Sequence, residues 1–119
     1  MARGAAVSDR PPPLGTLTDR VQLRRRDTTG EDEGGALTVF TPLAMVWARV
    51  RRLSARQAFE SDARGQDITH SVVFRFRTDL KPGDQIVYRG ETLEIVAIGD
   101  INGRRAYLGC QCSKRAVTG

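Results

Sequence analysis

The stretch from Ile68 to Ile98 constrains the fold most, because its side chains alternate between two faces with a period of two. The positions expected to face inward in its first part are Ile68, His70, Val72, Phe74 and Phe76. Such alternation is typical of a strand with one buried face. Pro82-Gly83 predicts a type II turn, and residues 89–92 predict a second turn. The stretch is therefore predicted to form three antiparallel strands, whose apolar face needs a partner surface.

Three further segments repeat the alternating pattern. Residues 19–26 are predicted to form a strand with Val21 and Leu23 facing inward, and residues 43–53 a strand with Val46, Ala48 and Val50 inward. Residues 36–42 are expected to pair only briefly. After an Asn-Gly turn at residues 102–103, residues 105–113 form the last predicted strand, whose buried face is expected to hold Ala106, Leu108, Cys110 and Cys112.

One short helix is predicted between these strands. Ser54 and Gln57 have the spacing of a capping box, in which each side chain satisfies a backbone N–H of the other residue. The helix should run from residue 55 to residue 64, with Phe59 as its main anchor into the sheet. Gly65 fits the position that ends a helix, because glycine adopts a left-handed conformation without strain.

These elements predict a mainly β protein, a small antiparallel β-barrel with one short helix and a long glycine-rich acidic loop. A short, twisted antiparallel sheet protects its edges by closing. At 119 residues the chain is expected to hold one domain at 19–113. Residues 1–18 are expected to form a flexible N-terminal extension and residues 114–119 a short tail.

The acidic loop is the least globular interior segment. It comprises Asp27, Thr28, Thr29, Gly30, Glu31, Asp32, Glu33, Gly34 and Gly35, and it contains no apolar side chain. A loop of this length in a small domain is usually functional or disordered. Two interpretations remain open: a solvated surface loop, or an acidic lining that repels DNA phosphates.

The chain as a whole is basic, with a formal net charge of +5 and a pI of about 10.0. That charge favours a polyanionic neighbour such as nucleic acid. The excess of arginine over lysine also arises in GC-rich genomes without any selection for binding.

The residues needed for catalysis or metal binding are sparse. His70 is the only histidine, and Cys110 and Cys112 are the only cysteines. No phosphate-binding loop, dinucleotide fingerprint or zinc motif occurs. We therefore expect no enzyme activity, no cofactor and no metal, and we expect the cysteines to be small buried side chains. The sequence lacks a transmembrane-length apolar run or a signal peptide pattern, so no membrane association is expected.

The order of motifs resembles the head-tail joining proteins (head closure, or stopper) of tailed bacteriophages and gene transfer agents. The matching pieces are Asp19-Arg20-Val21 with Leu23, a glycine-rich loop, Val46-Trp47-Ala48 with Val50, a short helix, Val72-x-Phe74-Arg75-x-Arg77, and Ile86-x-Tyr88-x-Gly90 with Leu93 and Ile95. The resemblance covers residues 17–113.

The resemblance implies a structural component of the neck of a virion or virus-like particle, assembled in the bacterial cytoplasm. It implies a homo-oligomeric ring with adaptor and portal-side proteins above and a tail terminator or tail tube below. Residues 27–40 would project into the channel through which double-stranded DNA passes without sequence-specific binding. Physical reasoning assigns the subunit or partner contacts to arginine-rich strand ends and one apolar anchor, namely Arg24, Arg25, Arg49, Arg51 and Trp47.

Two other functions are alternatives. A small β-barrel that binds single-stranded nucleic acid needs exposed aromatic side chains beside basic ones. Phe74 and Phe76 alternate with Arg75 and Arg77, so the aromatic and basic side chains should face opposite sides, which weakens this alternative. The other is the neighbouring adaptor or tail-terminator ring.

Overall fold

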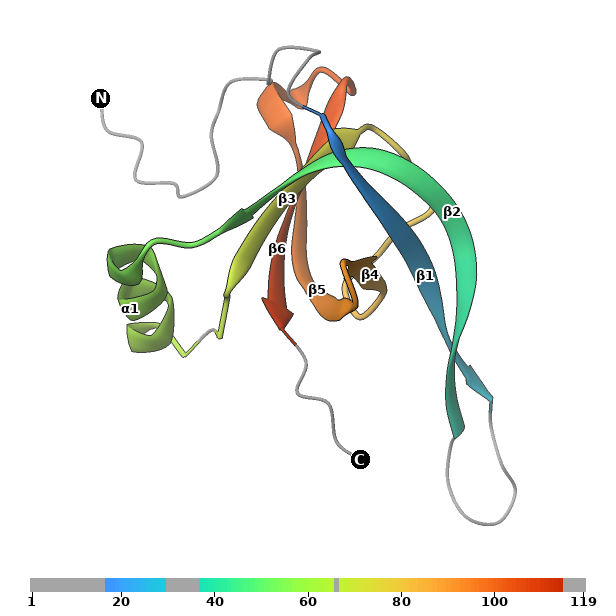
Figure 1. Cartoon of the computed structure of the whole chain (residues 1–119), viewed down its shortest axis with the longest axis horizontal. Helices are drawn as coiled ribbons and strands as arrows, with labels where there is room; N and C mark the ends of the chain where they lie inside the picture. Colours follow the sequence, from blue (N-terminus) through green and yellow to red (C-terminus); the bar gives the residue numbers. More distant parts are fainter. Residues whose placement is uncertain (1–16, 30–36, 66, 115–119) are drawn as a thin grey trace.

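The computed structural model describes residues 17–29, 37–65 and 67–114. Its elements are β1 (Asp19–Thr29), β2 (Leu37–Arg52), α1 (Ala55–Ala63), β3 (His70–Arg75), β4 (Gln85–Tyr88), β5 (Glu91–Asp100), a single 3₁₀ turn (Ile101–Gly103) and β6 (Tyr107–Lys114). The strands form a closed antiparallel barrel in the order β1-β2-β3-β6-β5-β4 (Figure 1). The predicted mainly β fold with a barrel and one helix is therefore confirmed.

The barrel core is built from the alternate positions that the sequence indicates. The fully buried apolar side chains include Val21, Leu23, Val72 and Phe74, and they pack with Ile86, Leu93, Ile95, Leu108, Cys110 and Cys112. Both cysteines are free and point into this core. Ala106 is exposed, contrary to the prediction, because β6 begins at Tyr107, two residues after the predicted start, and Tyr107 is the first buried residue of the strand.

One long strand replaces the two short ones predicted for residues 36–53. β2 continues through Pro42, and its ladder with β1 shifts register there, between Leu23 and Arg24. Proline lacks a backbone donor and is tolerated at bulges and at strand edges. Both conditions hold at Pro42, since β2 pairs with β3 only over Ala48–Arg52.

The predicted loop also begins later than expected. Asp27, Thr28 and Thr29 belong to β1 and pair with Val39, Thr38 and Leu37. Residues 30–35 lie outside the described residues. So do residues 1–16 and 115–119, where most of the predicted N-terminal extension and tail fall. Lys114, assigned to the tail, ends β6.

The helix begins at residue 55 as predicted and ends at Ala63, one residue before the predicted end, but its anchor is different. The Ser54 hydroxyl accepts the Gln57 N–H at 3.2 Å and the Gln57 side chain accepts the Ser54 N–H at 3.0 Å, which is the predicted capping box. Gly65 has φ +77°. Phe59, however, is 73% exposed, and Ser61 is the buried residue of α1. The Ser61 hydroxyl accepts the Ile68 N–H at 3.0 Å, so a hydrogen bond and not an aromatic side chain fixes α1 to the segment that leads into β3.

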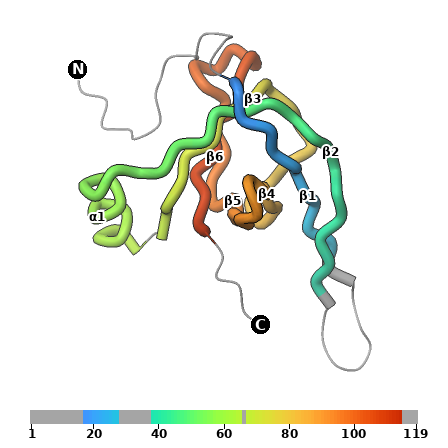
Figure 2. The backbone as a smooth tube through the Cα atoms, viewed as in Figure 1, coloured from blue at the N-terminus to red at the C-terminus, as the bar shows by residue number. Residues whose placement is uncertain are grey.

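Figure 2 shows the position of α1 relative to the barrel. α1 stands beside the ends of β2 and β3, away from the β1–β2 hairpin on the other side of the barrel. No helix in the described part of the chain is both long and apolar enough to cross a membrane.

Candidate functional site

The far end of the β1–β2 hairpin leaves the barrel as a two-stranded projection. β1 pairs with β4 only over Gln22–Arg24, whereas its ladder with β2 continues to Thr29. We call the paired segments 25–29 and 37–41 the arm. It extends away from the barrel in Figure 1. Residues 27–29 and 37–40 of the segment expected to enter a channel thus belong to this ladder.

A buried carboxylate fixes the base of the arm. Asp84, only 1% exposed, accepts the Arg26 backbone N–H on Oδ1 at 2.9 Å and the Lys81 N–H on Oδ2 at 3.0 Å. The Asp84 backbone carbonyl also accepts the Ile95 N–H at 2.9 Å. Asp84 therefore joins the arm to the turn before β4 and to β5.

Gly83 provides the space for this junction. Its φ is +101°, and an added Cβ would come within 3.0 Å of the Arg26 Nη1 atom. A side chain at this position would be strained by the left-handed backbone and would also press on Arg26. Sequence reasoning identified Pro82-Gly83 as a turn but missed Asp84, which only its position directly after that turn could have suggested.

The predicted contact residues Arg24 and Arg25 lie where the arm leaves the barrel. Arg24 donates from Nε to the Gln22 side chain at 2.8 Å. Arg25 is exposed, and its charge adds to the lowering of the Asp79 pKa, whose main cause is a hydrogen bond from Arg77. Farther out, the Thr41 hydroxyl donates to the Asp27 carboxylate at 3.1 Å across the arm.

The other predicted contact residues lie on the outer face of β2. Arg49 and Arg51 follow Trp47 at alternate positions, so the three side chains leave the barrel on one side. Pro42 pairs with Arg24, and Arg49 lies seven residue steps farther along β2, which is about 23 Å of strand. The structure therefore separates the five predicted residues into two groups.

Trp47 contacts an arginine that the sequence analysis did not assign to a site. It pairs with Arg20 across the β1 ladder, and the Arg20 guanidinium lies 4.9 Å from the ring centroid. Trp47 is 53% exposed and its neighbour Met45 is 50% exposed. Trp47 is thus an outward-facing side chain and not part of the core.

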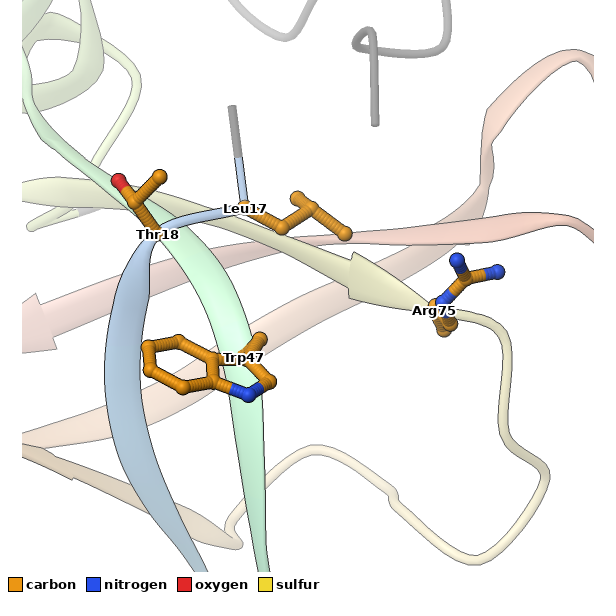
Figure 3. Close-up of a pocket in the computed structure, with 4 residues that line it drawn as sticks. All are labelled: Leu17, Thr18, Trp47 and Arg75. Atoms are coloured by element: carbon orange, nitrogen blue, oxygen red, sulfur yellow. The ribbon is translucent and has the colours of Figure 1, made fainter. Parts of the chain in front are cut away.

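A shallow groove of about 510 Å³ runs beside Trp47. Figure 3 shows its lining, with Leu17 and Thr18 at the start of β1, Trp47 on β2 and Arg75 at the end of β3. We call the surface formed by Arg20, Met45, Trp47 and Arg75 the tryptophan face. An apolar centre with a charged rim is the usual anatomy of a protein–protein contact.

The titratable core residues form no catalytic arrangement. His70 is buried; its Nδ1 lies 2.8 Å from the Thr69 hydroxyl and its Nε2 lies 3.9 Å from the Glu91 carboxylate. Burial lowers the His70 pKa, against the opposing effect of Glu91. Burial also raises the pKa of the Cys110 thiol to about 12, so this thiol stays protonated. In residues 17–29, 37–65 and 67–114 we find no group of three or more potential metal ligands.

Comparisons with known proteins agree with this architecture. Residues 12–115 match the family model described as phage head completion protein. None of the curated proteins compared with the chain matches it.

Two solved structures share the fold. Protein SF1141 from Shigella flexneri 2a superposes with a TM-score of 0.69 at 24% identity, over 88% of this chain and 98% of that one. A chain of the virion of a native gene transfer agent particle superposes with a TM-score of 0.57 at 15% identity, over 82% of this chain and 94% of that one.

Proposed function

The chain belongs to the phage head completion protein family, and on that premise we propose that it is a ring-forming stopper between a DNA-filled head and its tail. Head completion is a structural role, and the family is one of structural proteins. The ring, its adaptor and tail-terminator neighbours, and the passage of DNA through its channel are the parts that we propose.

The arm is the single observation that carries the channel role. A two-stranded ladder held at its base by Asp84 carries Thr29 and Leu37, which are joined in the sequence by residues 30–36, away from the barrel (Figure 1). Those residues include Glu31, Asp32 and Glu33, whose negative charges would repel DNA phosphates. In a ring of copies, acidic tips would narrow the channel without adhering to the DNA that moves through it.

The tryptophan face supports the proposed ring contact. It is a compact surface with an aromatic centre, and tryptophan and arginine are the side chains that most often dominate binding energy at interfaces. A head-to-tail contact between identical subunits closes into a ring when its rotation divides the circle. We assign this contact to Trp47, and the contacts with acidic neighbours to Arg24, Arg25, Arg49 and Arg51.

Deletion of the gene from its particle-producing host tests the proposal. We expect electron microscopy to show DNA-filled heads that lack tails and lose DNA, and we expect the intact gene supplied in trans to restore tailed particles. Normal tailed and infectious or transducing particles after deletion would overturn the proposal.

A second experiment separates the channel role from the joining role. The pair Glu31→Gln and Asp32→Asn removes two of the three negative charges at Glu31, Asp32 and Glu33, and Glu60→Gln with Asp62→Asn removes the same charge from exposed positions of α1. We expect both variants to form tailed particles but only the first to release DNA more slowly. Equal release from both would refute the channel role while leaving the joining role intact.

A single-stranded nucleic-acid-binding barrel is the second candidate. Trp47 beside Arg20 is an exposed aromatic next to a basic group, which the sequence analysis did not foresee, whereas Phe74 is fully buried. Stacking binders retain affinity at high salt that a merely basic surface loses. Filter binding of a single-stranded oligonucleotide at low and high salt would show retained affinity if this candidate were correct.

A further inference from the structure

A second groove, formed by arginines, lies between the barrel and α1. It has a volume of about 240 Å³ and is lined by Arg49, Arg51, Arg52, Leu53, Gln57, Ser71 and Val73. The strand register explains this grouping, because Arg49 pairs with Val73 and Arg51 with Ser71 on the neighbouring strand β3. Gln57 of α1 also lines the groove, and α1 stands beside the end of β2 and the start of β3 in Figure 1. We call it the arginine groove.

The arginine groove concentrates positive charge that has no counter-ion among the described residues. None of its lining residues is acidic, and no described carboxylate lies within 4.0 Å of Arg49 or Arg51. The charge of Arg52 also influences groups outside the groove, because it lowers the pKa values of Glu91 and His70. Arg49 and Arg51 are therefore the cations available to a ligand.

Arg49 also has hydrogen-bonding capacity that the folded chain does not use. Its Nε is buried and is the one buried side-chain nitrogen or oxygen without a hydrogen-bond partner in the described part of the chain. An unsatisfied buried donor is destabilising, so an acceptor supplied by a ligand would be favoured there. The planar guanidinium fork is suited to a carboxylate, which accepts two parallel N–H bonds.

The helix wall contributes a donor whose orientation is fixed. The Gln57 side-chain oxygen accepts the Ser54 N–H in the capping box, so the amide nitrogen of Gln57 remains to donate. The first turn of α1 contains no acidic residue, which leaves the positive end of the helix dipole uncompensated beside the groove. The oxygen of the Gln57 amide thus caps the helix, and the nitrogen of the same amide is available to donate to a ligand.

The geometry points to the arginine groove as a receptor for a carboxylate from an acidic segment of a neighbouring protein. The inference rests on the proposed function, because it supplies the chemistry of one contact in the neck. Leu53 and Val73 add apolar walls against which the methylene stem of a glutamate would pack. A DNA duplex fits less well, since its affinity comes from several phosphates contacted at once along a rigid backbone, whereas this groove is short and one wall is a helix.

Binding of defined probes to the purified full-length chain tests the inference. The probes are acetyl-hexaglutamate amide, which carries only side-chain carboxylates, acetyl-tetraalanine acid, which carries only a terminal carboxylate, and a short DNA duplex. Nuclear magnetic resonance follows the Arg49 Nε–H and the Ser71 and Val73 amides, and titration calorimetry gives each dissociation constant. We expect acetyl-hexaglutamate amide to shift these signals, because the proposed ligand is a side-chain carboxylate of an acidic segment. A shift caused by acetyl-tetraalanine acid alone would overturn that source.

Three variants locate the binding. Arg49→Gln with Arg51→Gln should weaken binding of the carboxylate probe by about tenfold or more, equivalent to about 1.4 kcal/mol. Arg49→Lys keeps the charge but lacks the fork, so it should give an intermediate loss. Arg104→Gln, in the exposed turn before β6, controls for loss of one positive charge and should change the constant by less than about twofold.

Several results would overturn the inference. These are an equal loss in Arg104→Gln, signals that do not move, or tighter binding of the duplex than of either carboxylate probe at the same groove residues. Tailless particles after gene deletion combined with no probe binding would leave the proposed function standing and remove only this groove. Probe binding combined with normal particles after deletion would leave the groove as a carboxylate site and remove the proposed function.

Discussion

Oδ1 of Asp84 accepts the backbone N–H of Arg26 at 2.9 Å, across 58 positions of sequence. The bond joins the base of the arm to the turn that begins β4, and the other oxygen of the same carboxylate holds the Lys81 N–H. Asp84→Ala should lower the free energy of unfolding by about 2–4 kcal/mol, because it leaves two part-buried N–H groups unsatisfied. Denaturant unfolding measures the loss.

The control for this prediction is Asp79→Ala, which removes the surface ion pair with Arg77 at 2.8 Å. Exposed pairs contribute about 0–1 kcal/mol, so this variant should remain close to the parent. Faster amide hydrogen exchange at Arg26 in Asp84→Ala alone would show that the arm is released. Equal stability of the two variants would contradict the role given to Asp84.

Trp47→Ala should leave the fold intact and impair assembly. The side chain is 53% exposed and its contact with Arg20 is worth about 0.5–1 kcal/mol, so the free energy of unfolding should fall by less than about 1 kcal/mol. The yield of tailed particles should fall. Phe59→Ala removes a comparably exposed aromatic from α1 and should leave the yield unchanged; a similar fall in both variants would count against the tryptophan face.

His70 should make the protein less stable in mild acid. Burial lowers its pKa below 6.5, although Glu91 opposes the shift, and the charges of Arg52 and Lys114 reinforce it. The unfolded chain therefore binds a proton near pH 6.5 that the folded chain takes up only at lower pH, and stability falls as the pH drops through that window.

Denaturant unfolding over a series of pH values checks the sign. His70→Gln should flatten the dependence between neutral pH and the lower pKa of the folded state, leaving only the loss at more acidic pH where carboxylates such as Glu91 become protonated. A parent protein whose stability rises as the pH falls through 6.5 would show that the His70 pKa is raised instead.

Cys110 and Cys112 should react with thiol reagents only when the barrel opens. Both side chains are fully buried, and burial raises both thiol pKa values, that of Cys110 to about 12. Thiolate is the reactive form, so labelling by a chromogenic disulfide should follow the rate of unfolding. Rapid labelling in native buffer would contradict this burial.

The sequence predicted the barrel well because its pattern reflects burial directly. Val72 and Phe74 alternate with positions that are partly buried or exposed, and the capping box at Ser54 is purely local. The anchor of α1 was wrong because a stripe containing Phe59 looks amphipathic whether or not a partner surface reaches it. The length of β2 was missed because a proline predicts a break unless one knows that the neighbouring edge is unpaired.

The candidate site was only partly predictable from the sequence, because its grouping depends on which elements lie next to each other. Arg49 and Arg51 were recognisable as charged residues on one strand, but their grouping with Ser71 and Gln57 depends on the β3 register and on where α1 stands. Arg20 appeared in the sequence analysis only as part of the Asp19-Arg20-Val21 motif. Its contact with Trp47 comes from the pairing of β1 with β2, which period alone does not specify.

The segment that carries α1 leaves and rejoins the barrel at one point. The Leu53 N–H donates to the Thr69 carbonyl at 2.9 Å, directly beyond the paired residues Arg52 and His70. A connection whose ends already meet can change length at little entropic cost. Residues 54–67 are therefore a replaceable module: insertions, deletions or a different helix there would leave the arginines of β2 in place while changing which neighbour they accept.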